Sequence, residues 1–345
     1  MQCVATSMQD LVGAGVTESY LGLAESQQRA VVQIVNDPAS KAPLCSGVFV
    51  TPEWVATAAH CLAISPTFVL INAGAGGPSS AVPVSDAQMA PSLDLALLRA
   101  DFGAPNAVFG DGTIPDPPPK DALDLGVRPI PFGATASTNL AIGDAVELAG
   151  YGLTEAMSSN ELRFLVETLV AMDATSVQVD GFGASGACDG DSGGPLLVRD
   201  RNGQATTVAV LSTGSSLCSG KDSYVLLARA ADWLESTLGS HAIGADPCGS
   251  IDVEGRCLFG SAVRCADGAL TAERCSPSEP CGWDAGSASV RCSSRTGCAG
   301  VDSVGQCLDH AAVTCQEGAT VVVPCAPCGT CRVAGTTGVP YCASF

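Results

Sequence analysis

The sequence predicts an all-β protein that ends in small cysteine-rich modules, and two observations support this. Short β-rich runs recur between clusters of Gly, Pro and Ser from Ala30 to His241, and 13 of the 18 cysteines lie in the last 98 residues. Strand-like runs at this spacing are typical of a sandwich or of barrels. The runs are VVQIV, SGVFV, TFVLI, AVELAGYG, FLVETLVAM, PLLV, TTVAVL and SYVLL.

Three features organise the chain before the cysteine-rich region. Residues 1–29 are mostly polar without a convincing period, which indicates a pro-segment or lead-in to a β-rich domain at 30–241. The stretch DGTIPDPPPKDALDLGVRPIPFG is rich in proline, which cannot donate within a central strand, so we expect two barrels to divide near 115–132. The domain closes with ARAADWLESTLGSH, whose apolar residues lie at helical spacing and predict a C-terminal helix.

The C-terminal region is an internal repeat. Six cysteines separated by eight, seven, nine, five and ten residues occur in 248–292, and the same five intervals recur in 298–342. Each module is too poor in large apolar residues to hold a core, so disulfides must supply the constraint. The sequence does not choose among the pairings that six cysteines allow.

Cys3 and Cys328 are left over from this arrangement. They either pair with each other, or Cys3 is lipid-modified in a longer precursor. Cys325, Cys328 and Cys331 form a CxxCxxC spacing that can hold a metal ion, but the surrounding repeat favours disulfides.

Composition excludes several classes of function. The net charge of −19 disfavours binding to nucleic acid or to anionic membranes, and no apolar stretch approaches the length of a membrane span. The cysteine density indicates an oxidising compartment, so we expect a secreted or extracellular protein, with the cell surface and the periplasm as alternatives. Because MQCVATSMQD lacks the pattern of an export leader, we expect the leader to be removed or to lie upstream.

Three short motifs carry chemistry. In GDSGGP the glycines around Ser192 permit a tight turn that aims two amide groups at one point beside the hydroxyl. A serine needs a base, and His60 in TAAHC is the best placed of the three histidines, while His241 and His310 fit exposed loops better. Asp94 in LDLALL lies in an apolar run, where an acid needs a partner.

Together TAAHC, DLALL and GDSGGP, in that order, resemble the trypsin- and chymotrypsin-like serine endopeptidases over roughly residues 30 to 240. The resemblance implies two antiparallel six-stranded β-barrels with the active site in the cleft between them. It makes His60 the general base, Asp94 its orienting carboxylate and Ser192 the nucleophile. The amides of Gly190 and Ser192 would form the oxyanion hole. GYGLT, from Gly150, matches the turn that begins the second barrel.

The same resemblance implies two disulfides. Cys45 and Cys61 would bracket the histidine loop, and Cys188 and Cys218 would join the nucleophile loop to the loop beside the specificity pocket. The other bridges of vertebrate members have no cysteines here, which is typical of a bacterial-type member.

Substrate selection follows less directly from the resemblance. Ser212 matches the serine beside the triad aspartate, and Gly214 matches a substrate-binding glycine. Gly186 stands where trypsin has its acidic pocket base, so an apolar or roomy pocket is the default expectation. An ungapped alignment places Asp222 on the far wall, where it would meet a basic side chain; the alternative is a solvated loop acid near Lys221.

Activation departs from the family pattern. Family zymogens mature when a new N-terminus pairs with the aspartate before the nucleophile, here Asp191. The usual IVGG is missing, and the equivalent position falls at Ser19 to Gly22. We expect either processing near Ser19 or a fold that orders the oxyanion loop without a cut.

The leading hypothesis is a secreted serine endopeptidase that acts on peptide or protein substrates through an acyl-enzyme. The alternative is a catalytically inactive homologue that serves in binding or adhesion. A third interpretation makes the C-terminal repeats the main functional element, in contact with a surface or matrix. We expect no cofactor and no metal, because phosphate-cradling loops and His or carboxylate clusters are missing from the sequence.

Overall fold

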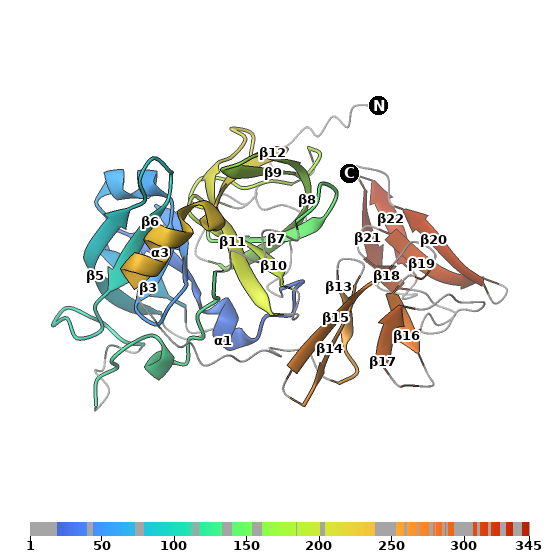
Figure 1. Cartoon of the computed structure of the whole chain (residues 1–345), viewed down its shortest axis with the longest axis horizontal. Helices are drawn as coiled ribbons and strands as arrows, with labels where there is room; N and C mark the ends of the chain where they lie inside the picture. The colour runs from blue at the N-terminus through green and yellow to red at the C-terminus, as the bar shows by residue number, and fades with distance from the viewer. Residues whose placement is uncertain are drawn as a thin grey trace.

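The computed structural model contains two β-barrels and a C-terminal region of short strands (Figure 1). It describes residues 19–39, 44–72, 79–110, 112, 117–132, 140–153, 161–183, 185–200, 204–238, 253–258, 261–267, 269–275, 279, 281–284, 287, 289–292, 306–308, 311–316, 319–324, 329–333 and 340–344. The predicted pairing of Cys3 with Cys328 and the positions of His241 and His310 lie outside these residues. No helix within the described ranges has the length and apolar character needed to cross a bilayer.

The first barrel closes in the strand order β1-β2-β3-β6-β5-β4, with every neighbouring pair antiparallel. Its strands are β1 (Val31–Val35), β2 (Cys45–Phe49), β3 (Trp54–Thr57), β4 (Phe68–Ile71), β5 (Ser80–Met89) and β6 (Ala96–Ala100). Valine, isoleucine and aromatic residues fill these strands because branched and aromatic side chains pack well on a pleated surface. A short 3₁₀ helix, η1 (Ala59–Ile64), follows β3.

The second barrel closes in the order β10-β11-β12-β9-β8-β7, which confirms the predicted two-barrel fold class. Its strands are β7 (Ala145–Gly150), β8 (Arg163–Met172), β9 (Ser176–Asp180), β10 (Pro195–Arg199), β11 (Ala205–Thr213) and β12 (Lys221–Leu226). After the 3₁₀ helix η3 (Leu227–Ala230), α3 (Ala231–Leu238) ends the domain with Leu234 and Leu238 buried, as the helical spacing predicts.

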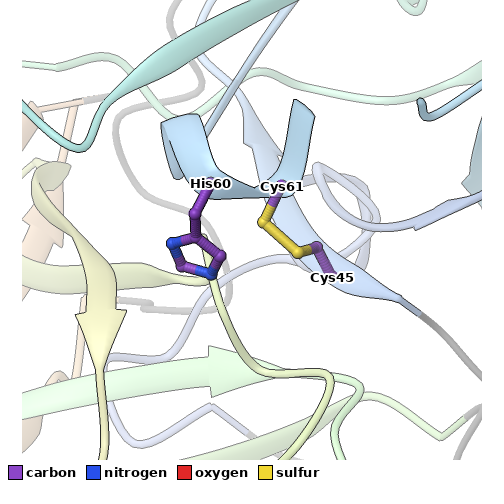
Figure 2. Close-up of side chains that lie close together, drawn as sticks. All are labelled: Cys45, His60 and Cys61. Atoms are coloured by element: carbon purple, nitrogen blue, oxygen red, sulfur yellow. A yellow bond between two sulfur atoms is a disulfide. The ribbon is translucent and has the colours of Figure 1, made fainter. Parts of the chain in front are cut away.

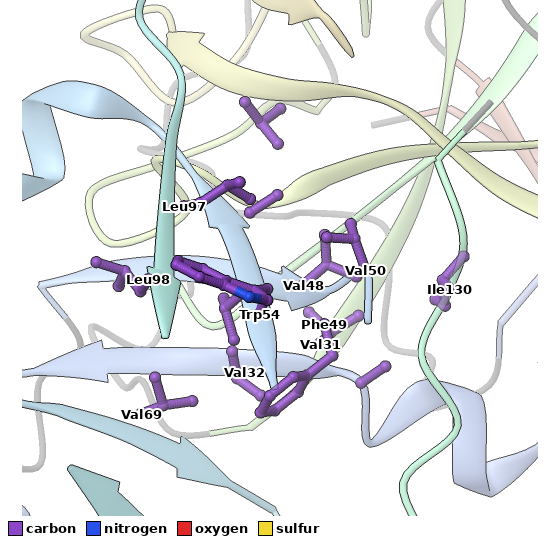
Figure 3. Packing of buried hydrophobic residues seen from close by; sticks show 14 of the residues in the cluster. Val31, Val32, Val48, Phe49, Val50, Trp54, Val69, Leu97, Leu98 and Ile130 are labelled. Carbon is purple, nitrogen blue, oxygen red and sulfur yellow. The ribbon is translucent and has the colours of Figure 1, made fainter. Parts of the chain in front are cut away.

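Apolar side chains from the first barrel and from the junction with the second form one buried cluster. Figure 3 shows Trp54 of β3, Phe49 of β2 and Ile130 of the connecting segment among its members. A separate cluster fills the second barrel, with Leu169 and Val179 fully buried inside it. The two barrels therefore meet through apolar packing, which is dense and deforms little.

The proline-rich segment connects the barrels. The amide of Ile130 donates to Phe49 of the first barrel at 2.9 Å, and Thr207 of the second barrel donates to Pro131 at 2.8 Å. Its short helix η2 (Leu123–Leu125) packs beside the first barrel, where the Ala122 amide donates to Pro52. The segment thus passes from one barrel to the other at the place where prolines interrupt the strand pattern.

Part of the polar N-terminal stretch is integral to the barrels. Leu21 and Leu23 are buried, and the helix α1 (Glu25–Gln28) leads directly into β1. Ser19 Oγ donates to the Glu147 carboxylate at 2.7 Å, and the Leu21 amide donates to its other oxygen at 2.7 Å. Ser19 and Leu21 belong to the stretch that its polar composition assigned to a lead-in. They nevertheless attach the segment before β1 to Glu147 of β7.

The C-terminal region repeats one strand pattern. A three-stranded sheet and a two-stranded sheet occur twice, and the corresponding strands lie about 50 residues apart in the numbering. The strands are β13 (Arg256–Leu258), β14 (Ser261–Ala266), β15 (Ala269–Arg274), β16 (Cys281–Asp284), β17 (Ser289–Cys292), β18 (Gln306–Leu308), β19 (Ala311–Gln316), β20 (Ala319–Pro324), β21 (Gly329–Val333) and β22 (Pro340–Ser344). A disulfide joins Cys275 to Cys292.

Candidate active site

His60 and Asp94 lie against each other in the first barrel. His60 occupies η1, which is held by the buried neighbours Ala58 and Cys61 while the imidazole stays exposed. The Nδ1 atom lies 2.8 Å from Asp94 Oδ2, and the His60 amide donates to Oδ1 at 2.9 Å. Two contacts to one carboxylate fix the imidazole's direction and leave Nε2 available for proton transfer.

A third group completes this carboxylate's environment. Ser212, at the end of β11 in the second barrel, donates its hydroxyl to Asp94 Oδ2 at 2.6 Å. Burial acts to raise the pKa of Asp94, but the hydrogen bonds from Ser212 and His60 outweigh burial and bring the pKa below its ordinary value. Asp94 is therefore ionised at neutral pH and able to stabilise a protonated imidazole.

Ser192 lies in the tight turn before β10, next to the histidine helix. Its carbonyl oxygen accepts the Ser46 amide at 2.8 Å and lies 3.7 Å from Cys61 Sγ. Within the described residues the Ser192 hydroxyl forms no hydrogen bond to the His60 ring. Such bonds are often long in proteins without substrate.

Ser46 of β2 connects the first barrel to the turn that carries Ser192. This fully buried residue donates its hydroxyl to the Gly190 carbonyl at 2.9 Å, and its Oγ accepts the Tyr151 amide at 3.0 Å. Its own carbonyl accepts the Thr57 hydroxyl at 2.8 Å. Ser46 therefore holds the peptide between Gly190 and Asp191 in one orientation.

The amides of Gly190 and Ser192 are available to a ligand. Among the described residues neither amide donates a hydrogen bond. By contrast, the Asp191 amide donates to the Cys188 carbonyl and the Gly193 amide donates to the Leu211 carbonyl. Gly190 has a φ of +98°, a conformation that glycine adopts without strain. Two free amides on one tight turn can stabilise an oxyanion.

Asp191 lies buried under this turn. Its Oδ1 accepts the Gly152 amide at 2.7 Å, and its Oδ2 accepts the Cys188 amide at 2.9 Å. An ideal Cβ on Gly150 would approach Asp191 Oδ1 to within 2.1 Å, which explains the glycine in the GYG turn. The carboxylate thus ties the loop around Ser192 to the GYG turn that follows β7.

Two disulfides stiffen the site. The structure joins Cys45 to Cys61 and Cys188 to Cys218. Figure 2 shows the His60 imidazole beside the first of these bridges, and the ligand atoms of the three side chains lie within 4.8 Å of one another. Because both sulfurs belong to a disulfide, this group offers no thiolate to a metal ion.

Of the residues that the resemblance assigns to substrate binding, Asp222 and Gly214 lie side by side in the second barrel, while Ser212 contacts Asp94. Asp222 is fully buried, and its two oxygens accept the amides of Ala187 at 2.7 Å and Ser215 at 3.2 Å. Burial raises the pKa of Asp222 to about 6. Gly186 lies against the backbone of Ser219, because an ideal Cβ on Gly186 would be 2.9 Å from the Ser219 Cα. An ideal Cβ on Gly214 would likewise be 2.9 Å from Asp222 Oδ1.

Sequence reasoning missed three residues of this region. Ser46, Glu147 and Glu167 are buried polar side chains whose partners lie 144, 128 and 18 residues away in the chain. The two glutamates interrupt the apolar runs AVELAG and RFLVETLVAM, and this interruption is the sequence feature that could have indicated them. A buried acid in such a run requires a partner, although the sequence does not name it.

Known proteins share this domain. The family model described as Trypsin matches residues 22–234, which is more than half of the chain. An uncharacterized peptidase of Corynebacterium glutamicum is 28% identical over 210 residues, covering 57% of this chain and 65% of the relative, so this chain spans less than two thirds of that relative's length.

Animal proteins match over a similar stretch. Serine protease SP24D of Anopheles gambiae is 26% identical, covering 56% of this chain and 72% of the relative. Chymotrypsin-like elastase family member 3A of Homo sapiens is 25% identical, covering 57% of this chain and 79% of the relative. With its two closed barrels and the match to the family model, the chain belongs to the trypsin family.

Proposed function

We propose that this chain is a secreted serine endopeptidase that cleaves peptide bonds through a Ser192–His60–Asp94 triad. The observation that carries the proposal is the pair of contacts from His60 to Asp94, at 2.8 and 2.9 Å, with Ser212 as a third partner of the carboxylate. This arrangement prepares the imidazole to accept a proton and to remain stable as a cation.

The reaction proceeds in two halves. Ser192 Oγ attacks the substrate carbonyl carbon while His60 Nε2 takes the hydroxyl proton, and the resulting oxyanion accepts the amides of Gly190 and Ser192. The C–N bond then breaks, and the leaving amine receives that proton from His60. In the second half, water loses a proton to His60 and attacks the acyl carbon. The bond between that carbon and Ser192 Oγ then breaks, His60 returns the proton to Oγ, and the acid product leaves.

The chain is competent without a cut at residue 19 in this proposal. Support comes from Asp191, whose oxygens accept amides of Gly152 and Cys188, and from Ser19 and Leu21, which bind Glu147 with the preceding chain attached. Intact mass and N-terminal sequencing of active protein test this. Activity that arises only after cleavage before Ser19 would establish the zymogen alternative.

Export and the C-terminal modules belong to the same proposal. Among the described cysteines every one is disulfide-bonded, which fits an oxidising compartment. The repeats would then serve as a stable element that retains the enzyme at a surface or matrix.

A fluorophosphonate probe tests the catalytic proposal. We expect labelling of the wild type and of Ser236→Ala, a control serine exposed on α3, and no labelling of Ser192→Ala. Peptide hydrolysis should follow the same order. Correctly folded wild type that neither reacts with the probe nor cleaves a peptide library would instead establish the inactive, binding homologue.

A further inference from the structure

Asp222 on β12 is a fully buried acid that joins two other segments of the second barrel. Its Oδ2 accepts the Ala187 amide at 2.7 Å, and its Oδ1 accepts the Ser215 amide at 3.2 Å. These partners lie 35 and 7 residues away along the chain. Because both oxygens accept backbone amides, the carboxylate orients the main chain of each segment relative to the other.

The two segments lie against each other beside this carboxylate. An ideal Cβ on Gly214 would be 2.9 Å from Asp222 Oδ1 and 3.3 Å from the Ala187 carbonyl oxygen. Gly214 is exposed, so the buried acid lies directly behind a stretch of surface backbone. The Cys188–Cys218 disulfide joins the same segments further along. The disulfide limits their separation, and the two amide contacts add a fixed direction.

The Ala187 segment leads into the turn that carries Ser192. The Cys188 amide donates to Asp191 Oδ2 at 2.9 Å, and the Asp191 amide donates back to the Cys188 carbonyl at 3.0 Å. Asp191 immediately precedes Ser192 in the chain. A change in the direction of the Ala187 backbone would therefore reach the amides of Gly190 and Ser192, which are proposed to bind the oxyanion.

The Ser215 segment continues from the end of β11, which contacts the other side of the site. Ser212, three residues before Ser215, donates its hydroxyl to Asp94 Oδ2 at 2.6 Å. Asp222 is thus connected through short stretches of backbone to both Ser192 and Asp94. No other acid among the described residues accepts amides from these two segments together.

The surroundings of Asp222 make these amide contacts important for its charge. Burial is the largest cause that brings the pKa of Asp222 to about 6, while the two amide bonds act to lower the pKa and the charge of Asp180 acts to raise it. The charge of Asp222 in turn raises the pKa of its buried neighbours Glu167 and Tyr224. At pH 8 the carboxylate is ionised, the form that accepts both amides.

We propose that Asp222 is a positioning residue for catalysis, whose carboxylate sets the orientation of the turn that carries Ser192 relative to the end of β11 that contacts Asp94. This rests on the proposed peptidase function. Asp222 makes no contact with the substrate in this role, so its loss slows the turnover of every peptide alike. Displaced amides of Gly190 and Ser192 stabilise the oxyanion less, and the loss therefore falls on kcat.

Steady-state kinetics at pH 8 on two fluorogenic peptides, which differ only in Arg or Phe before the cleaved bond, test this. Asp222→Asn keeps the size of the side chain but replaces one acceptor oxygen by an NH2 group. We expect kcat to fall about 10-fold on both peptides with KM little changed. The matched control Asp232→Asn changes an exposed aspartate on α3 and should behave as the wild type. A fall confined to the Arg peptide would overturn the proposal and assign Asp222 to substrate recognition.

A second variant separates positioning from stability. Asp222→Ala removes both acceptors, so we expect kcat of the folded variant to fall further than in Asp222→Asn, by about 100-fold. Thermal unfolding gives the Tm of each variant beside its kcat. A lower Tm with the wild-type kcat in the folded enzyme would instead assign Asp222 a purely structural role.

Amide hydrogen exchange works independently of catalysis. In an inactive Ser192→Ala background, we expect Asp222→Asn to speed exchange at the Ala187 amide, the Ser215 amide or both by about 10-fold or more. Asp232→Asn should leave both exchange rates unchanged. Unchanged exchange at both amides in Asp222→Asn would refute the contacts on which the proposal depends. Faster exchange in a protein whose wild type the fluorophosphonate leaves unlabelled would refute only the peptidase proposal.

Discussion

We predict that Glu147 makes the stability of the trypsin-family domain depend on pH. Its carboxyl group is fully buried on β7, where it accepts the Ser19 hydroxyl and the Leu21 amide. Burial raises the pKa of Glu147 from 4.5 to about 7, although the bonds from Ser19, Leu21 and Tyr20 and the charge of Arg199 act to lower it. The folded protein therefore holds a proton here that the unfolded chain releases near its ordinary pKa.

The difference between the pKa values of Glu147 in the folded and unfolded states sets the direction and the size of the change in stability with pH. Between pH 4.5 and about 7 the folded state binds the extra proton, so the contribution of Glu147 to stability is full below pH 4.5 and is lost as the pH rises through about 7. At about 1.36 kcal/mol for each pH unit, the loss is about 3 kcal/mol. For a domain of this size that corresponds to roughly 6–12 °C in Tm.

Urea and thermal unfolding of the wild type and Glu147→Gln from pH 4 to pH 8.5 measure the effect. Glutamine keeps an acceptor for Ser19 but does not titrate, so we expect the wild type to lose about 3 kcal/mol relative to the variant across this range. Asp222 and Glu167 also titrate, but equally in both proteins, so the difference between the curves isolates Glu147. If the free energies of unfolding of the wild type and Glu147→Gln change in parallel with pH, the raised pKa of Glu147 is refuted.

Three further substitutions test the active site. Ser46→Ala removes the hydroxyl that holds the Gly190 carbonyl, so steady-state kinetics should show kcat falling about 5- to 10-fold with KM little changed; a rise in KM alone would contradict this. Asp94→Asn should lower kcat/KM at pH 7 by about 10⁴-fold without loss of Tm, because the imidazole loses its charged partner; activity near that of the wild type would exclude the triad. Gly193→Ala places a Cβ 2.0 Å from Thr57 Oγ1 and 2.6 Å from the Ser46 carbonyl at a φ of +79°, so unfolding should show a loss above about 3 kcal/mol; wild-type stability would be inconsistent with this packing.

The strand pattern was predictable only in part. Runs such as VVQIV and TTVAVL are continuous and apolar, and they form β1 and β11. The strand β5 carries polar residues on exposed positions and β9 carries them on half-buried ones, and their short or mixed sequences do not separate them from loops. Their place in the barrels is fixed by neighbours such as β6 and β12, which the local sequence does not contain.

The buried acids show the same limit. Glu147 lies inside an apolar strand, and the sequence indicates only that such a carboxyl needs a partner. That partner is Ser19, 128 residues earlier, in a stretch whose polar composition suggested a separate lead-in. The distance between partners along the chain leaves no local pattern to detect.

What the sequence determined by itself is the chemistry that short motifs can encode: the serine turn, the histidine beside its cysteine, the acid in an apolar run, and the cysteine periodicity. What only the tertiary structure decided is how distant polar groups are paired, including Ser46 with Gly190 and Glu167 with Ser185. The reason is physical, because backbone turns and strand propensities depend on neighbouring residues. The energy of a buried polar group depends on whichever distant donor folding brings to it.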